Sequence, residues 1–222
     1  MRLRVVAAIG ALCLASVTFG AARAEPSAAQ AARLAQLRPE SVIISRSSEK
    51  VAIRGGDLGR FDPQRSPVEN LHELIGHLGL LHDAARSAEF TVAEQMPRFV
   101  KFTQLIGGIP VSQRIEVELD PDGRVVEARL AVVDPARAPH AQPITRERAL
   151  EIAVRACATE IGAAEAEVAL RDFPGLHYQP TAMGEPLQLE YRFSGSGGPA
   201  SSYIVRVDAF TGAARVELGV IA

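Results

Sequence analysis

Apolar positions recur every three or four residues in three segments of the chain, at residues 27–38, 66–79 and 145–162. This spacing places the apolar side chains on one face of a helix. We therefore expect three amphipathic helices, the second and third of which pack on sheets. The apolar positions of these two are Leu71, Leu74, Ile75 and Leu78, and then Ala149, Leu150, Ala153, Val154, Cys157 and Ile161.

Residues that begin or end helices stand at the borders of these segments. Pro39 stops the first, because proline cannot continue a helix. Ser66 can cap the second, and Glu69 stands where a capping box requires an acidic side chain. Gly79 can end that helix in the left-handed conformation, and Thr145 can cap the third.

Apolar and charged residues alternate in residues 99–105 and 114–119, which predicts strands with one dry and one wet face. Residues 120–123 carry proline and glycine where a tight turn favours them. A returning strand then follows, with Val126, Ala128, Leu130 and Val132 on one side. The register of this hairpin stays open, because a bulged turn would move Val117 off Val126.

Shorter apolar runs predict further strands. Residues 42–44 and 51–53 flank a polar turn. Later in the chain the predicted strands are 168–171, 187–193, 203–207 and 213–217, the last two joined by a turn at 208–212.

The order helix, then sheet, occurs twice, so the predicted fold class is α+β, with two lobes that each pack a helix on an antiparallel sheet. Residues 25–60 form a lead-in helix and short strands, and residues 61–134 the first lobe. Residues 135–143 contain three prolines and are interpreted as a linker. The second lobe is residues 144–222.

The first 24 residues are typical of a signal peptide. Arg2 and Arg4 precede an apolar run at 5–14, and small residues stand at the positions required for cleavage before Glu25. We expect export to the periplasm or the extracellular space. The run is about half of the ~20 residues that cross a bilayer, so a stable membrane anchor is not expected.

Composition and charge narrow the classes of function. The chain of 222 residues has a formal net charge of -2 and only two lysines, Lys50 and Lys101, so nucleic acid is not an expected partner. Once residues 1–24 are removed, Cys157 is the only cysteine, and an intramolecular disulfide is excluded. Cys157 shares the apolar face of its helix, which predicts a packing role rather than nucleophilic catalysis.

The histidines at 72 and 77, with Glu73 between them, suggest a zinc protease, but the spacing is wrong. Histidines five residues apart are separated by ~140° around a helix, against ~40° for the four-residue spacing of zinc proteases. Glu69, Glu73 and His77 do share a face, which we interpret as solvated surface. His82 follows the glycine that ends the helix. A metalloenzyme using Glu73 and His77 is the least favoured hypothesis, and no metal or cofactor is predicted.

Residues 194–198 are rich in glycine but lack the lysine of a phosphate loop and the strand-to-helix context of a nucleophile elbow. We interpret them as a flexible hairpin loop. No set of residues in the sequence can be assembled into a catalytic site, and the protein is predicted not to be an enzyme.

Residues 99–111, with the core QLIGGIPV at 104–111, and the turn DPDGRVV at 120–126 resemble the fungalysin/thermolysin propeptide (FTP) domain. From residue 144 onward the chain resembles a PepSY domain, through its alanine-rich helix, residues 189–193 and residues 203–212. The tandem order is similar to that of thermolysin-type prosegments. The resemblance implies two cystatin-like lobes.

In that family the two lobes assist folding of the attached metalloprotease and block its cleft. The 222 residues contain no His-Glu-x-x-His motif of such a protease. We therefore expect an exported, noncatalytic protein that binds a thermolysin-like metalloprotease in trans, as inhibitor, folding chaperone or both. The apolar tail of Gly219, Val220, Ile221 and Ala222 could enter the cleft of such an enzyme. The alternative is a periplasmic or extracellular module that binds a peptide or an envelope component and has no protease partner.

Overall fold

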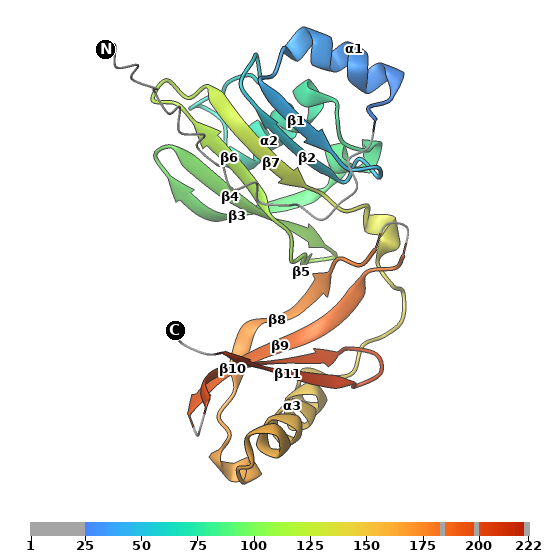
Figure 1. Ribbon diagram of the computed structural model, residues 1–222, viewed down its shortest axis with the longest axis vertical. Coiled ribbons are helices and arrows are strands. Elements are labelled where there is room, and N and C mark those ends of the chain that lie inside the picture. The colour runs from blue at the N-terminus through green and yellow to red at the C-terminus, as the bar shows by residue number, and fades with distance from the viewer. Residues whose placement is uncertain (1–24, 183–184, 198–199, 220–222) are drawn as a thin grey trace, which may run out of the picture.

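The computed structural model describes residues 25–182, 185–197 and 200–219. Within these ranges the fold is mixed α+β, with three α-helices and two antiparallel sheets of seven and four strands (Figure 1). The predicted signal peptide, residues 1–24, lies outside the described residues. In the part of the chain that is described, no helix is both long and apolar enough to span a membrane.

The larger sheet has the strand order β1-β2-β7-β6-β4-β3, and β5 pairs with β4 off this path. Strand β3 was not predicted, because few of its residues face the core and a bulge between Val92 and Glu94 interrupts its alternation. The strands are β1 (Ser41–Ile44), β2 (Lys50–Arg54), β3 (Glu89–Met96), β4 (Phe99–Ile106), β5 (Ile109–Pro110), β6 (Ile115–Leu119) and β7 (Val125–Ala131).

Two helices belong to this sheet, α1 (Ala28–Leu37) and α2 (Pro67–Leu78). The predicted capping box of α2 is present between Ser66 and Glu69, and Gly79 ends the helix in the left-handed conformation. The predicted apolar face of α2 is buried in the core, and so is Leu37 at the end of α1. A 3₁₀ turn (Asp83–Ser87) follows α2.

Residues 25–60 are part of the same sheet and core as residues 61–134. Strand β2 pairs with β7 along its whole length. Val51 and Ile53 are almost completely buried in the first core. The predicted helix and strands of residues 25–60 are present, and their buried side chains share one core with α2 and with the strands that follow.

The register of β6 and β7, which the sequence left open, contains a bulge. Val117 lies opposite Ala128, but Leu119 lies opposite Val125, so one extra residue is accommodated in β7. Val125 is 4% exposed and takes the core position, whereas Val126 is only half-buried. The expectation that Val126 would continue the inward row of Ala128 is therefore wrong.

The smaller sheet has the order β11-β10-β9-β8 and packs on α3 (Arg146–Ile161). Its strands are β8 (Arg171–Gln179), β9 (Gln188–Gly197), β10 (Ala200–Asp208) and β11 (Ala214–Gly219). The strand predicted at 168–171 is wrong except for its last residue, because a 3₁₀ turn (Glu165–Glu167) precedes it and β8 begins at Arg171.

The predicted hairpin loop at 194–198 is also corrected for the residues that the structure describes. Residues 194–197 continue β9, and Gly195 pairs with Tyr203. A Cβ atom on Gly195 would lie 2.3 Å from the ring of Tyr203, so the glycine here permits close packing rather than a flexible loop.

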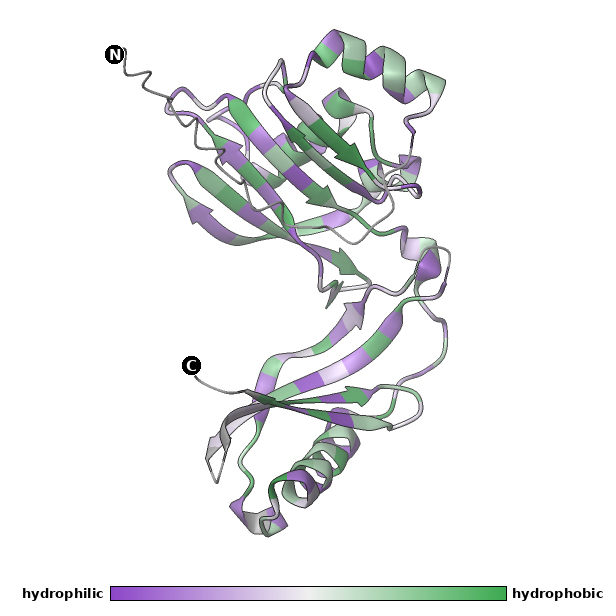
Figure 2. Ribbon diagram, in the orientation of Figure 1, coloured by the Kyte–Doolittle hydropathy of each residue, from purple (hydrophilic) through white to green (hydrophobic). Residues whose placement is uncertain are grey.

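Each sheet has its own hydrophobic core (Figure 2). The first lies between the larger sheet and the helices α1 and α2, and the second between the smaller sheet and α3. The segment predicted as a linker, 135–143, begins with a 3₁₀ turn (Pro135–Arg137) and leads from the first core to the second.

Candidate functional site: the cleft between the two sheets

The motif at residues 104–111 forms part of the joint between the two sheets. Gln104 is fully buried and pairs with the backbone of Val133 in both directions. Its Nε2 donates to the carbonyl oxygen of Val133 (2.8 Å), and the Val133 N–H donates to its Oε1 (2.9 Å). The side chain thus fixes the backbone at the point where the chain leaves β7.

The remainder of the motif carries the chain across to the smaller sheet. Gly107 and Gly108 both have positive φ, at 58° and 78°, and form the tight turn between β4 and β5. Val111 then bridges to Tyr178 of β8 in parallel orientation, and the Ser112 N–H donates to the Tyr178 carbonyl oxygen at 2.8 Å. The motif's glycines and apolar residues therefore have a structural role at the joint.

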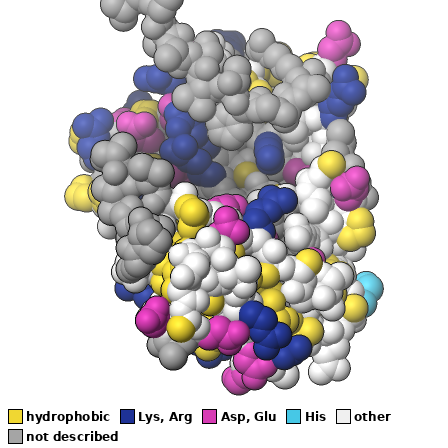
Figure 3. Space-filling view, turned by 60° about the horizontal axis from the view of Figure 1, so that its bottom comes forward, with side chains coloured by type: hydrophobic (Ala, Val, Ile, Leu, Met, Phe, Trp, Pro, Cys, Tyr) yellow, Lys and Arg dark blue, Asp and Glu magenta, His cyan; other side chains and the backbone are white. Residues whose placement is uncertain are grey.

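A cleft of about 470 Å³ opens beside this joint. One wall comes from β4 and β6 of the larger sheet, and the other from β8, where Pro174 and His177 line the cleft. Pro110 and Val111 of the joint also line it. Figure 3 looks toward the hollowed region between the two parts, where lysine and arginine side chains gather together with acidic ones.

The wall from the larger sheet carries charges in pairs. Lys101 donates to Glu94 on the neighbouring strand, with the nitrogen 2.6 Å from the carboxylate oxygen. Arg114 is paired with Glu116, whose side chain is largely buried. Thr103 lies on the same face of β4 as Lys101 and adds a hydroxyl group to the cleft.

The opposite wall holds a buried histidine. His177 is 1% exposed, and its Nδ1 lies 3.0 Å from the carbonyl oxygen of Gly175. A carbonyl oxygen only accepts hydrogen bonds, so Nδ1 carries a proton. Nε2 lies 3.0 Å from Glu190 Oε1 on β9, although the two are not aligned for a hydrogen bond. His177 therefore places Nε2 beside a buried carboxylate oxygen on the neighbouring strand.

Glu190 is surrounded by positive charge. Arg206 on β10 approaches its Oε1 to 3.2 Å, and Arg192 to 3.9 Å. Burial alone would raise the pKa of Glu190, but the contact with His177 and the charges of Arg206 and Arg192 together lower it below its usual value. Glu190 is therefore ionised at neutral pH. Glu217 on β11 pairs with Arg206 from the other side.

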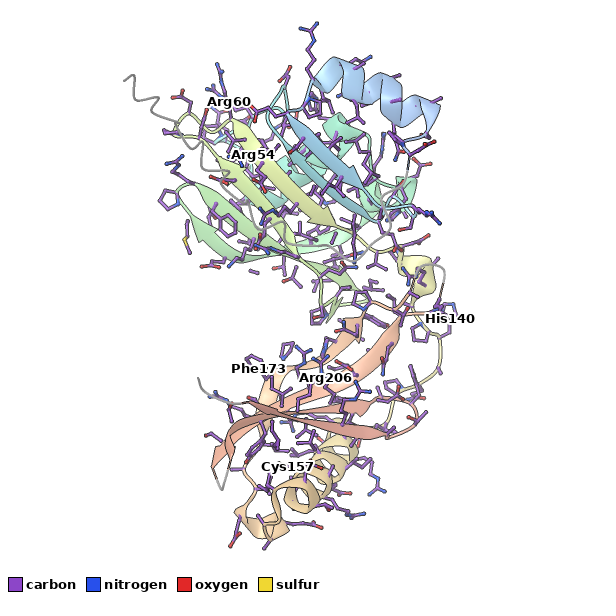
Figure 4. The ribbon with its side chains drawn as sticks, viewed as in Figure 1. Arg54, Arg60, His140, Cys157, Phe173 and Arg206 are labelled. Atoms are coloured by element: carbon purple, nitrogen blue, oxygen red, sulfur yellow. The ribbon has the colours of Figure 1, made fainter. Side chains whose placement is uncertain are left out.

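These five residues, His177, Glu190, Arg192, Arg206 and Glu217, form what we call the sheet-face cluster. Figure 4 shows Arg206 on the side of the smaller sheet that faces the larger one, and Cys157 on the side of α3. The cluster was missed in the sequence. The sequence feature that could have revealed the cluster is the alternation of residues 189–193, which places Glu190 and Arg192 on the face opposite Tyr191.

The residues considered for a metal site have separate structural roles. His72 Nδ1 faces the carbonyl oxygen of Arg86 (3.2 Å), whereas His77 Nε2 faces that of Asp57 (3.1 Å). Glu73 pairs with Arg65. Glu69 completes the cap of α2, and its hydrogen bonds to Ser66 lower its pKa.

His82 lies away from these residues, with its Nε2 2.9 Å from the carbonyl oxygen of Val132. Within the described ranges, no three His, Cys, Asp or Glu side chains converge as a metal site would require.

Cys157 lies in the core between α3 and the smaller sheet, as the apolar pattern predicted. Burial raises the pKa of its thiol, which disfavours the reactive thiolate. Of the predicted partner-binding tail, Gly219 is the last residue of β11 and pairs with Ser202. Val220, Ile221 and Ala222 lie outside the described residues.

No model of a known protein family matches the chain. No curated protein matches it either. The resemblance to propeptide domains therefore remains a prediction. The geometry itself provides a cleft with charged and apolar lining, held between two sheets by a buried joint. Such an arrangement is suited to binding a polypeptide or another ligand with a charged group.

Proposed function

We propose that this chain is an exported, noncatalytic, propeptide-like protein with two cystatin-like lobes, which binds a thermolysin-like metalloprotease in trans. Binding inhibits the enzyme, assists its folding, or does both. The observation that carries the proposal is the position of the motif at 104–111. The residues that resemble a prosegment are those that join the two sheets through Gln104 and Val111.

The joint supports a role in binding because it lets the two parts act as one surface. A macromolecular interface of ordinary size needs about 800 Å² on each partner. Two small units held together meet that requirement more readily than either alone. The joint is made of buried contacts between Gln104 and Val133 and between Val111 and Tyr178, which favour a fixed arrangement.

An edge of the smaller sheet provides a physical route to association. Among the described residues β11 pairs only with β10, so its other side is open to a further strand. Leu218 near the end of β11 is 49% exposed, and so is Phe173 of β8. Leu218 directly precedes the tail 219–222. We therefore expect its exposed side chain to pack against the enzyme beside the cleft that the tail enters.

The proposal is tested by adding the purified chain 25–222 to a thermolysin-like enzyme and following cleavage of a peptide substrate. We expect inhibition that increases with concentration and saturates. In a second arm, the denatured enzyme is refolded with and without the chain, and the recovered activity is measured. If the chain neither inhibits the enzyme nor improves its refolding, the proposal is wrong.

Two truncations test the tail. A chain ending at Gly219 keeps all residues of β11, whereas one ending at Leu218 also removes the pairing of Gly219 with Ser202. If the tail enters the enzyme cleft, the chain ending at Gly219 already loses inhibition while its melting temperature is unchanged. Full inhibition by the chain ending at Leu218 would exclude the tail as the contact.

The second candidate function is a periplasmic or extracellular module that binds a peptide or an envelope component. The observation that favours it is the cleft of about 470 Å³, which lies within this chain and requires no protease. Affinity capture from the exported fraction separates the two functions. A metalloprotease recovered specifically supports the first, and recovery of only a peptide or envelope component supports the second.

A further inference from the structure

We propose that a hollow on the larger sheet is a docking site for an acidic segment of a partner protein, which inserts one aliphatic side chain between Lys50, Arg114 and Arg129. The hollow is lined mainly by β1, β2 and β7, which lie side by side in the sheet (Figure 1). It lies on the outer face of these strands, by which we mean the face turned away from the first core. This inference goes beyond the proposed function, because it requires neither a metalloprotease nor the tail 219–222.

The apolar part of the hollow comes from two short side chains on the outer face. Val51 on β2 and Leu130 on β7 belong to the first core. Since side chains alternate along a strand, the next residues, Ala52 and Ala131, face outward. Ala52 lies opposite Ile43 of β1, which is 44% exposed. These three residues line a hollow of about 40 Å³.

The charged residues that line the hollow are all cations. They are Lys50, Arg114 and Arg129, and no acidic residue of the described ranges lines it. The whole chain has a formal net charge of -2, so this positive lining is a local feature and does not follow from composition. A hollow with apolar and cationic lining complements a partner that carries an apolar group beside negative charge.

The carboxylates that pair with these cations are covered, whereas the cations are exposed. The side chain of Arg114 is 54% exposed and that of its partner Glu116 only 10%. The side chain of Arg129 is 40% exposed and that of its partner Glu127 only 17%. Lys50 is exposed as well and forms no ion pair within the part of the chain that the structure describes. A partner approaching this face therefore meets positive charge, and each guanidinium group keeps further N–H donors for its carboxylates.

The three cations stand around Ala131. Lys50 lies opposite it on β2. Arg114 is on the other side, because Ile115, the next residue, pairs with the residue before Ala131. Arg129 is two residues earlier on β7, about 7 Å along the strand. An aliphatic side chain above Ala131 therefore has cations on three sides.

The size of the hollow indicates a single side chain of a larger partner. Pockets that enclose a small ligand usually have about 300–1,000 Å³. A hollow of about 40 Å³ takes the end of one aliphatic side chain and is too small for a whole acyl chain. In an extended segment, side chains two positions apart point to the same side, about 7 Å apart. The partner segment is therefore extended, with acidic residues two positions before and after an aliphatic one.

The experiment is an NMR titration of the isotope-labelled chain 25–222 at low salt, followed through its backbone amide signals. The probe is the peptide acetyl-EALAE-amide. The control acetyl-QALAQ-amide lacks the charges, and acetyl-EAAAE-amide lacks the aliphatic side chain. We expect saturable shifts at Ala52 and Ala131 with the probe, and at least fivefold weaker binding of each control. No binding of the probe, binding of either control within fivefold of it, or shifts confined to other parts of the chain would each overturn the proposal.

Octanoate distinguishes a peptide from a lipid-like ligand, because it combines one carboxylate with an acyl chain. We expect it to bind at least fivefold more weakly than the probe peptide, since the hollow has no room for the acyl chain. Octanoate binding that is tighter than this limit would show that the site takes a lipid-like anion, and the proposal of a protein partner would be wrong.

Variants assign the contacts. Lys50→Gln removes an exposed charge and Ala52→Leu fills the hollow, so each is expected to weaken binding of the probe at least fivefold. The matched controls are Arg148→Gln on α3, where Arg148 is exposed and pairs with Glu151, and Ala93→Leu at an exposed position of β3 at the other edge of the sheet. Both controls should bind the probe as the parent does. Melting temperatures verify folding, and unchanged binding by either folded test variant would refute the assignment.

Discussion

Arg137 binds both carboxylate oxygens of Glu49 with one nitrogen, at 2.5 and 2.7 Å, although the two residues are 88 positions apart. Both side chains are only 12% exposed. The other guanidinium nitrogens donate to the carbonyl oxygens of Ala182 and Glu185 and to the hydroxyl group of Thr181. One arginine in the connecting segment therefore ties the β1–β2 turn to the residues that precede β9.

Replacing Arg137 by glutamine is expected to lower the free energy of unfolding by about 3 kcal/mol, because Glu49 would stay buried without its partner. Urea unfolding followed by circular dichroism measures this. The control is Arg54→Gln, whose pair with Glu127 is 3.9 Å long and 68% exposed on the arginine side. Its effect should stay below about 1 kcal/mol. Similarly small losses in the free energy of unfolding for both variants would show that the contact between Arg137 and Glu49 does not stabilise the connection between these segments.

Gln104→Leu tests the joint at the motif. Leucine has a similar size but leaves both the N–H and the carbonyl oxygen of Val133 unpaired in the interior. We expect a loss of about 3 kcal/mol, since each unsatisfied buried group costs about 1–3 kcal/mol. The matched control is Gln95→Leu on the exposed side of β3, where a change within about 0.5 kcal/mol is expected. Equal effects of the two substitutions in urea unfolding would contradict this role for Gln104.

The elements that were predicted correctly are those determined by interactions between residues close together in the sequence. The caps of α2 lie within three residues of one another, so Ser66, Glu69 and Gly79 define its borders without reference to the remainder of the chain. The turn at 208–212 likewise depends on hydrogen bonds between near neighbours. Burial of Cys157 followed from its position on one helix face.

What the sequence did not predict depends on contacts between distant segments. Strand β3 is interrupted by a bulge and contributes few residues to the core, so its pattern is weak. The choice of Val125 over Val126 depends on how β7 meets β6. The sheet-face cluster requires that His177 and Glu190 from different strands lie side by side. Charged residues at alternate positions of a strand gave no indication that they would be buried together.

Gly195 is closely packed and Gly76 is not, so replacing each with alanine should change the stability of the fold in opposite directions. At Gly195 an added Cβ would lie 2.6 Å from the backbone oxygen of Ala169 as well as against the Tyr203 ring, and backbone cannot move aside cheaply. Gly195→Ala should therefore destabilise the fold by about 1–3 kcal/mol. Gly76→Ala, in the exposed interior of α2 with nothing within 4 Å, should stabilise it by up to about 1 kcal/mol. Thermal unfolding distinguishes the two, and a shift of both melting temperatures in the same direction would contradict the packing role of Gly195.

Acid should weaken the turn between β10 and β11 through Asp208. Its Oδ1 accepts hydrogen bonds from the Phe210 N–H (3.0 Å), the Thr211 N–H (2.7 Å) and the Thr211 hydroxyl (2.9 Å). Burial acts to raise the pKa of Asp208, but these bonds, and one from Gln188, lower it below its usual value. A carboxyl group with a lowered pKa in the folded state stabilises the fold above the pKa of the unfolded chain, about 4. That contribution is lost as the pH falls through the lower, folded value.

The prediction is that Asp208→Asn unfolds at a lower urea concentration than the parent chain at pH 7, and that the difference shrinks as the pH falls below about 4. Asparagine cannot supply the charge that the two N–H groups favour, so the parent loses its advantage only where Asp208 becomes protonated. Asp122→Asn, an exposed position in the β6–β7 turn, is the control and should show a small difference that does not vary in this way. A gap between parent and Asp208→Asn that is as wide at pH 3 as at pH 7 would show that the charge of Asp208 does not stabilise the turn.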